Sequence, residues 1–203
     1  MIPCRIIGGL TGASGVIYGI RLLDLLREAG AETHLVMTPA AERTIAYETQ
    51  SKIGEVQARS HTHYPYTDIG AALASGSFKT GGMVIACCSI RTLSEIATGV
   101  TSNLMTRAAD VCLKERRPLI LMVRETPFHL GHLRSMAALT EMGAIIAPPL
   151  PAFYAQPQSI DEMIDQSVLR ILDLLGFEAP GLKRWGEDLR PARPGKARTR
   201  EPS

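Results

Sequence analysis

The residues with the clearest chemical potential form a glycine-rich turn near the N-terminus. Segment 8–15 reads Gly-Gly-Leu-Thr-Gly-Ala-Ser-Gly and follows an apolar run. Glycines let a backbone approach a ligand closely, and the free N–H groups and dipole of a following helix favour an anion. The spacing is G-x-x-G-x-x-G, which differs from the dinucleotide pattern G-x-G-x-x-G. The turn therefore predicts a mononucleotide phosphate at Gly12 to Gly15, with a ligand-free tight turn as the alternative.

Two more polar clusters follow apolar runs. Segment 89–92, Ser-Ile-Arg-Thr, comes after the run 83–87, and Arg124-Glu125 closes the run 118–123. Ligands of open α/β sheets collect beyond the carboxyl ends of strands, so both clusters could share one crevice with the glycine turn. The first cluster is also explained by a helix N-cap. The second is either a solvated strand exit or an anion clamp beside a general acid or base.

Other charged residues lie on predicted helices. Lys114 follows Arg107 by two helical turns, so both face one side, as solvated surface charges commonly do. Asp110 and Lys114 have the i,i+4 spacing of an ion pair. Arg170 lies opposite the apolar stripe of the last helix and is expected to face solvent or a neighbouring subunit.

The histidines and cysteines do not form a metal-binding pattern. His129 and His132 could share a helix face, but no carboxylate or thiol completes a site. The cysteines lie at positions 4, 87, 88 and 112 without a C-x-x-C spacing, which indicates reduced thiols in a cytoplasmic protein. The adjacent Cys87 and Cys88 are expected in the buried core.

Apolar runs alternate with amphipathic segments, which predicts an α/β fold with a mainly parallel sheet flanked by helices. Residues 50–82 are ambiguous, with a short strand or loop near Tyr64 and a short helix over 68–74. The predicted strands are 4–8, 32–37, 83–87, 118–123 and 144–147. The predicted helices are 17–29, 39–48, 93–99, 103–114, 130–142 and 160–175, the last with an apolar face that starts at Ile160 and a cap at Ser159.

Length and composition exclude several classes of protein. The chain has 203 residues, 45% of them hydrophobic, which suits one domain over residues 1–187. The formal net charge is +2, so a nucleic-acid partner is not expected. No apolar run is long enough to predict a membrane partner. The basic segment 188–203 is predicted to be a disordered tail.

Taken together and in order, these segments resemble the flavin prenyltransferases of the UbiX type, once described as phenylacrylic acid decarboxylases. The likeness covers roughly residues 5 to 186 and rests on uninterrupted blocks, which are more specific than a single motif. The matching blocks are 11–15, 47–49, 88–94, 107–111, 114–119, 124–127, 151–154 and 157–159.

The resemblance implies a Rossmann-like flavoprotein fold and a homododecamer with active sites between subunits. It implies that reduced FMN receives, at N5 and C6, a five-carbon unit from dimethylallyl monophosphate. The product, prenylated FMN, would serve a UbiD-type decarboxylase, and no metal is implied. The FMN-binding residues that the resemblance implies are Gly12, Ala13, Ser14, Thr38, Ser89, Ile90, Arg91, Thr92 and Arg124. The donor-binding residues that it implies are Lys114, Arg124, Tyr154 and Arg170.

The implied chemistry suits these residue types. Cleavage of an allylic phosphate places positive charge on the allyl group and negative charge on the departing phosphate. The cations at 114, 124 and 170 would stabilise the phosphate, and an apolar, aromatic-poor pocket would keep water from the allyl group. Ser14, Glu48 and Glu125 are the candidate catalytic residues, which would move protons as the flavin reacts.

Three positions depart from the family pattern: Thr38 replaces the usual Ser, Gln50 a common Asp, and Cys87 a common Pro. None removes a proposed phosphate-binding or proton-handling group. Two alternatives are an FMN-dependent cysteine-type decarboxylase of the same fold and a non-catalytic flavin carrier. The decarboxylase class is expected to carry an early catalytic His and an Asn-bearing motif, which are not evident here. The intact Glu48, Glu125 and Arg170 argue against a carrier.

Overall fold

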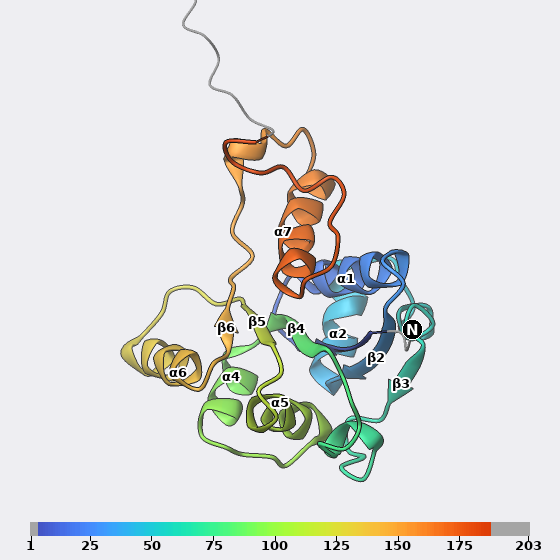
Figure 1. The fold of residues 1–203 in the computed structure, drawn as a ribbon, viewed down its shortest axis with the longest axis vertical. Helices are drawn as coiled ribbons and strands as arrows, with labels where there is room; N and C mark the ends of the chain where they lie inside the picture. The colour runs from blue at the N-terminus through green and yellow to red at the C-terminus, as the bar shows by residue number, and fades with distance from the viewer. Residues whose placement is uncertain (1–3, 188–203) are drawn as a thin grey trace, which may run out of the picture.

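The computed structural model describes residues 4–187, whose centre is a six-stranded sheet (Figure 1). The strands lie in the order β3-β2-β1-β4-β5-β6, and every neighbouring pair is parallel. This order reverses between β1 and β4, which is where doubly wound folds bind nucleotides. The strands are β1 Arg5–Leu10, β2 Glu32–Met37, β3 Thr62–Tyr64, β4 Gly82–Cys88, β5 Leu119–Val123 and β6 Ile145–Ile146. The predicted α/β fold with a parallel sheet is confirmed.

Helices cover both faces of the sheet because its central strands are apolar on both sides. Val84 and Ala86 of β4 pack with α1 Val16–Glu28 and α7 Ile160–Leu174. Met83 and Ile85 point to the other face, where α4 Ile90–Ala97, α5 Leu104–Lys114 and α6 Leu130–Glu141 lie. The short β3 and the helices α2 Pro39–Glu48 and α3 Ile53–Gln57 complete the β2 side of the molecule.

Polar caps set several helix starts. Thr38 accepts a hydrogen bond from the Ala41 N–H, with Pro39 in the first turn of α2. Ser89 and Ser159 cap α4 and α7 in the same way. The caps predicted at these two serines are confirmed, and α4 begins at Ile90, three residues earlier than expected.

Some local expectations are wrong. The predicted helix over 68–74 is only a 3₁₀ turn, η1 Ala72–Ala74, whose last carbonyl, that of Ala74, accepts a hydrogen bond from Arg107 of α5 at 3.1 Å. Asp110 pairs with Arg107 at 2.7 Å, and Lys114 pairs with its neighbour Glu115, so no Asp110–Lys114 pair forms. Ile160 is 71% exposed because it occupies the first turn of α7, beyond the sheet. The predicted tail 188–203 lies outside the described residues.

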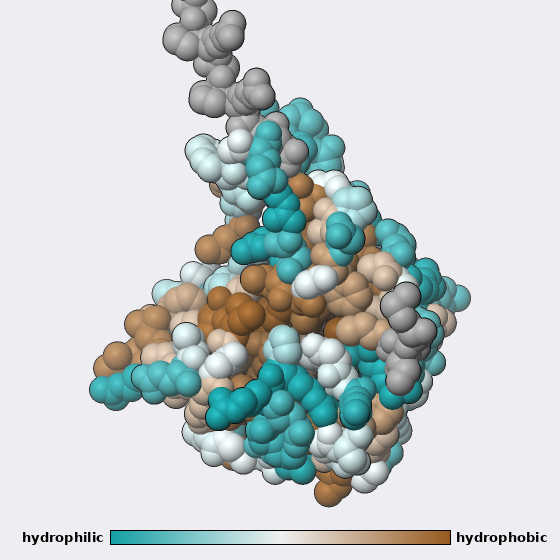
Figure 2. Space-filling view, in the orientation of Figure 1, coloured by the Kyte–Doolittle hydropathy of each residue, from teal (hydrophilic) through white to brown (hydrophobic). Residues whose placement is uncertain are grey.

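The molecule exposes an apolar surface at the α6 end, visible in brown at the left of Figure 2. Phe128, Leu130, Leu133 and Met142 are each between 42% and 59% exposed. Only Leu139 of α6 is buried. Patches of this kind mark contact sites for other proteins or other copies of the chain. None of the helices within residues 4–187 is long and apolar enough to cross a membrane.

Candidate functional site

Two loops meet at the point where the strand order reverses. The Thr11 hydroxyl donates to the Cys87 carbonyl at 2.6 Å and accepts from the Ser89 N–H at 2.9 Å. Thr11 is 1% exposed, so these bonds join the glycine turn after β1 to the segment after β4 beneath the surface. The two polar clusters predicted to share a crevice are therefore neighbours at the carboxyl edge of the sheet.

The start of α1 is already occupied by a carboxylate. Glu48, at the end of α2, accepts hydrogen bonds at Oε2 from the N–H groups of Gly15 (2.8 Å) and Val16 (3.2 Å). Gly15 has a φ of +94° and supplies no side-chain cap, so Glu48 caps this helix from 33 residues away. The prediction of free N–H groups for a phosphate across the whole turn is wrong at Gly15, because a partner distant in sequence has taken its donor.

Two other positions of the turn face solvent, although the Ala13 N–H donates to the Thr11 hydroxyl at 3.5 Å. Gly12 and Ser14 are exposed, and Ser14 follows the buried Ala13 directly. A Cβ on Gly12 would lie 2.5 Å from the Ala40 Cβ, so glycine is required where the turn packs against α2. Thr38 is only 7% exposed, and its hydroxyl caps α2 beside this turn. An accessible backbone beside hydroxyl groups is the donor set that an FMN phosphate and flavin ring need.

Two charged groups flank the buried thiol of Cys87. Burial raises the pKa of Cys87 to about 12, while the charge of Arg124 opposes this shift and that of Glu48 adds to it. Arg124 follows β5, and its N–H donates to the Cys88 carbonyl at 3.1 Å. Its guanidinium is exposed and forms no ion pair with a carboxylate of residues 4–187. Arg124 is thus a cation available to an anion at this edge.

The remaining crevice residues lie nearby but have local partners. Ser89 accepts from the Thr92 N–H at 3.3 Å and donates to the Thr92 hydroxyl at 3.2 Å. Arg91 pairs with Glu95 at 2.8 Å on the outside of α4. Glu125 accepts from the Thr126 N–H at 2.9 Å. The segment 89–92 therefore caps α4 through Ser89 and also lies beside the glycine turn. A helix cap and a place at the crevice are compatible.

Tyr154 and Arg170 come together at a second place. They line a cavity of about 130 Å³ with an apolar wall that includes Met122, Leu150 and Leu174. They also line a cavity of about 280 Å³ with Lys183, Arg184 and Trp185. The ring centroids of Tyr154 and Trp185 lie 5.6 Å apart in an edge-to-face arrangement. A group with an anionic head and an apolar body could lie across the boundary of these two cavities.

Trp185 and the cations beside it were not among the predicted site residues, and the predicted pocket was poor in aromatic residues. Trp185 is the single tryptophan of the chain and is 78% exposed. An exposed tryptophan preceded by Lys183 and Arg184 could have indicated a binding surface. The segment follows the last helix and has no periodic pattern, so its spacing gives no signal of a site.

Lys114 lies away from the other predicted donor-binding residues. It ends α5, which leads into the start of β5, whereas Arg124 follows the end of the same strand. Lys114 therefore lies at the amino edge of the sheet and pairs with Glu115. One chain does not bring Lys114 and Arg124 together.

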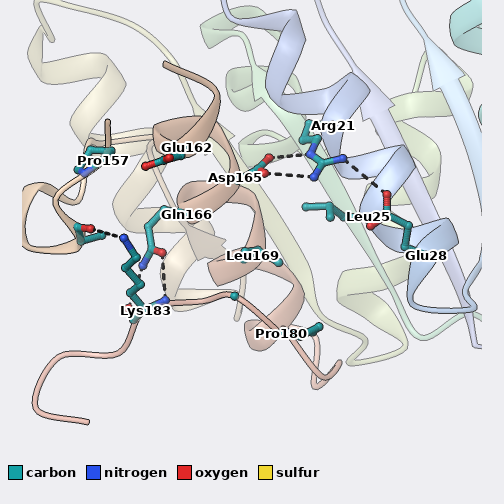
Figure 3. Close-up of a pocket in the computed structure, with 12 residues that line it drawn as sticks. Arg21, Leu25, Glu28, Pro157, Glu162, Asp165, Gln166, Leu169, Pro180 and Lys183 are labelled. Atoms are coloured by element: carbon teal, nitrogen blue, oxygen red, sulfur yellow. Dashed lines mark hydrogen bonds and ion pairs between the residues drawn. The ribbon is translucent and has the colours of Figure 1, made fainter. Parts of the chain in front are cut away.

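A third cavity, of about 380 Å³, lies between α1 and α7 (Figure 3). Arg21 of α1 donates to both carboxylate oxygens of Asp165 of α7, at 2.6 and 3.1 Å, and also pairs with Glu28 at 3.6 Å. Lys183 donates to the Ala155 carbonyl at 2.7 Å. The two cations that line this cavity, Arg21 and Lys183, are thus already bound to protein oxygens. None of the predicted site residues lines this cavity.

Comparisons with known proteins agree with one another. The sequence pattern of the Flavoprotein family matches residues 2–171. The flavin prenyltransferase UbiX of Escherichia coli K12 is 55% identical over 184 residues, which cover 89% of this chain and 97% of that protein. A crystal structure of AnUbiX (PadA1) in complex with FMN and dimethylallyl pyrophosphate has a TM-score of 0.89 and 45% identity, with 90% of this chain and 97% of that chain covered.

A second solved structure is described as a dodecameric FMN-dependent UbiX-like decarboxylase from Escherichia coli O157:H7. Its TM-score is 0.87 at 43% identity, with 89% of this chain and 98% of that chain covered. The FMN-dependent cysteine decarboxylase TvaF reaches a TM-score of only 0.59 at 19% identity, which shows a shared fold alone.

Proposed function

The chain belongs to the Flavoprotein family and, within it, to the flavin prenyltransferases, and on this premise we propose that residues 1–187 form one domain that joins a dimethylallyl group to FMN. When bound, reduced FMN would supply the ring that accepts the five-carbon unit. The observation that carries the proposal is that Arg124 lies beside the glycine turn and has no carboxylate partner within residues 4–187. The relative with FMN and dimethylallyl pyrophosphate bound supports this assignment.

The flavin side of the reaction uses the crevice at the reversal point. The exposed turn at Gly12, Ala13 and Ser14 would lie against FMN, with the hydroxyls of Thr38 and Ser89 nearby. The first turn of α4 would add backbone donors at Ile90 and Arg91, and Arg124 a positive charge. The Thr92 N–H already donates to Ser89, so the contribution of Thr92 is its hydroxyl.

The donor side needs more than one copy of the chain. Arg124, Tyr154 and Arg170 would bind the phosphate of dimethylallyl monophosphate, and Lys114 would reach it from a neighbouring copy, because it lies at the opposite edge of its own sheet. The dodecameric relative and the exposed apolar residues near α6 support assembly. These cations would stabilise the departing phosphate, where charge develops in the transition state.

Three residues would move protons at the reacting flavin. Glu48 is held at the start of α1 by two N–H groups, which fixes its carboxylate next to Ser14. Glu125 follows Arg124 and is partly buried. The variant Glu125→Gln tests its part: an unchanged rate of prenylated FMN formation would remove Glu125 from the mechanism.

The product would pass to a decarboxylase of the UbiD type.

All four cysteines are unpaired, and Cys87, Cys88 and Cys112 are buried. Free thiols suit the reducing conditions of the cytoplasm, which is where we place the reaction.

The decisive experiment is anaerobic incubation of the purified protein with reduced FMN and dimethylallyl monophosphate, followed by mass spectrometry of the released flavin. We expect a flavin heavier by one five-carbon unit that is absent without protein. Unmodified FMN that binds tightly, with the diphosphate donor as well, would exclude the transferase and leave the carrier. Consumption of a cysteine-derived peptide acid with release of CO₂ would identify the decarboxylase instead.

A further inference from the structure

Asp173 lies between Arg170 and Arg184, two arginines that line the cavity of about 280 Å³ together with Tyr154. Its Oδ2 accepts a hydrogen bond from Arg170 Nη1, and its Oδ1 accepts one from Arg184 Nη2 at 2.5 Å. The side chain of Asp173 is 19% exposed, whereas those of Arg170 and Arg184 are 56% and 41% exposed. The carboxylate therefore lies beneath two guanidinium groups that reach the surface.

The two arginines come from different segments. Arg170 precedes Asp173 by about one turn of α7 and lines both cavities. Arg184 belongs to the segment 182–187 that returns along α7, here called the C-terminal strap. Asp173 thus fixes a residue of the strap relative to a residue of the helix.

Further contacts hold the strap in place. Gln166, only 7% exposed, donates to the Lys183 carbonyl at 2.9 Å and accepts from the Lys183 N–H at 3.1 Å. The Lys183 ammonium donates to the Ala155 carbonyl, next to Tyr154. Because these bonds do not involve Asp173, its substitution should change the charge between the arginines without releasing the strap.

Charge at this cavity is the property that Asp173 controls. Arg170, Lys183 and Arg184 line the cavity of about 280 Å³, and the half-buried carboxylate of Asp173 offsets one of the two arginine charges. Glu187 is 74% exposed and lies 4.0 Å from Arg184, so water screens its charge more strongly. The Arg184 guanidinium and that of Arg170 hold the pKa of Asp173 below its ordinary value, so it is ionised at neutral pH.

We propose that Asp173 is a positioning and specificity-determining residue that matches the cavity of Tyr154, Arg170 and Arg184 to an allylic monophosphate and disfavours the diphosphate. A diphosphate carries roughly one more negative charge than a monophosphate. Because Asp173 already offsets one arginine charge, that charge is not available to balance the additional negative charge. The inference rests on the proposed prenyl transfer, because that function supplies the phosphate donor.

The test compares both donors in three variants. In Asp173→Asn, the ratio of kcat/KM for dimethylallyl diphosphate to that for the monophosphate should rise about tenfold, because one negative charge is removed within a few ångströms of the bound anion. Asp173→Glu keeps the charge and should keep the wild-type ratio. Asp165→Asn, on the same helix, loses the ion pair with Arg21 at a different cavity and should also keep it.

Calorimetric titration with inorganic phosphate and pyrophosphate gives a readout that does not need turnover. Asp173→Asn should bind pyrophosphate about tenfold more tightly relative to phosphate. If Asp173→Asn does not fold, Asp173→Ser makes the same change of charge with a smaller side chain. If Asp173→Asn binds pyrophosphate more tightly relative to phosphate but the wild type forms no prenylated flavin, prenyl transfer is refuted. The effect of Asp173 on the charge of the bound anion would still stand.

Three outcomes would overturn the inference while prenylated flavin still forms. One is an unchanged donor ratio in a folded Asp173→Asn. Another is an equal shift in Asp165→Asn, which would indicate a general loss of stability. The last is a shift in Asp173→Glu as large as in Asp173→Asn, which would exclude charge as the cause.

Discussion

At the amino edge of the sheet, arginines are bound to protein groups on several sides, whereas at the carboxyl edge Arg124 has no carboxylate partner within residues 4–187. Arg117, 15% exposed at its side chain, donates to the carbonyls of Gly76 at 2.6 Å and Phe78 at 2.8 Å. Arg5 pairs with Glu32 at 3.0 Å and lies over the Phe78 ring at 4.8 Å. The same residue type thus has two uses in one sheet.

The difference follows from what each edge must hold. The segment before β4 forms short turns with local hydrogen bonds, and arginines at the amino edge bond its half-buried carbonyls at Ala74, Gly76 and Phe78. At the carboxyl edge, backbone groups of the short turns are bonded by side chains that are distant in sequence but lie at the same edge, such as Thr11 and Glu48. A cation there contributes little to folding and is available for an anion. Removing arginines from the two edges should therefore affect different properties.

The largest effect is expected from Arg124→Ala. It should lower kcat/KM for prenyl transfer by about 10²–10³-fold, because a cation aimed at developing charge is lost. The free energy of unfolding should change by less than about 0.5 kcal/mol, as for an exposed residue. Anaerobic product formation and urea unfolding measure the two quantities. Arg124→Lys should recover part of the rate. A large loss of stability in Arg124→Ala would contradict the conclusion that arginines have different roles at the two edges.

Next in size is Arg117→Ala at the other edge. Two carbonyls of the segment before β4 would lose their donor, which should cost about 2–3 kcal/mol of unfolding free energy. The rate per folded molecule should stay close to that of the wild type. Arg116→Ala is the matched control, because Arg116 is exposed, and it should cost far less. Equal losses in both variants would contradict a structural role for the bonds of Arg117.

A smaller effect is expected at the start of α1. Glu48→Ala removes the acceptor of the Gly15 and Val16 N–H groups and should cost about 1 kcal/mol of stability. Glu48→Gln keeps an oxygen at this position and should cost less, although its rate should fall if the charge of Glu48 takes part in proton transfer. Chemical unfolding of the two variants separates the cap from the charge. Similar stability in Glu48→Ala and the wild type would refute the cap.

The smallest effect concerns pH. His34 is 3% exposed and lies between Glu32 (3.1 Å) and the Tyr64 hydroxyl (3.0 Å). Burial lowers the pKa of His34, and Glu32 partly opposes this shift. The unfolded chain then binds more protons, so stability present above about pH 6.5 is lost as the pH falls toward the folded-state pKa.

The loss is expected to reach about 1 kcal/mol between pH 7.5 and 5.5, measured by urea unfolding. His34→Gln should be less stable at pH 7.5 and show a smaller pH dependence. Burial also lowers the pKa of His63, so His63→Gln measures its separate share. A pH dependence that survives unchanged in both variants would place the titrating group elsewhere.

The strongest local signals in the sequence predicted their elements closely. The segments 32–37 and 39–48 were predicted as a strand and a helix and have these bounds in the structure. The strand 32–37 ends in the apolar run Leu35–Met37, and Pro39 after Thr38 marks a helix start. Within residues 50–82, the structure has the strand alternative near Tyr64, as β3, whereas the helix expected over 68–74 is only a 3₁₀ turn. Carbonyls of this stretch bond distant partners such as Arg107 and Arg117, which no local pattern indicates.

For the candidate site, the sequence identified residue types but not their partners. The glycine turn, the serine cluster and Arg124 were found because they follow strands that end at one edge. The bond from Gly15 to Glu48 joins residues 33 apart, and the strap pairs Arg184 with Asp173 across the end of α7. No local spacing encodes such contacts, so the cap and the arginine pair were missed.

The order of residue types was enough to predict the α/β alternation, the residues that follow each strand, and the resemblance to the flavin prenyltransferases. Which of these residues can act together depends on how the folded chain packs. Lys114 and Arg124 are close in sequence, yet β5 lies between them and carries them to opposite edges of the sheet. The physical reason is that an extended strand separates its ends by about 3.3 Å per residue, while parallel pairing gathers distant strand ends at one edge.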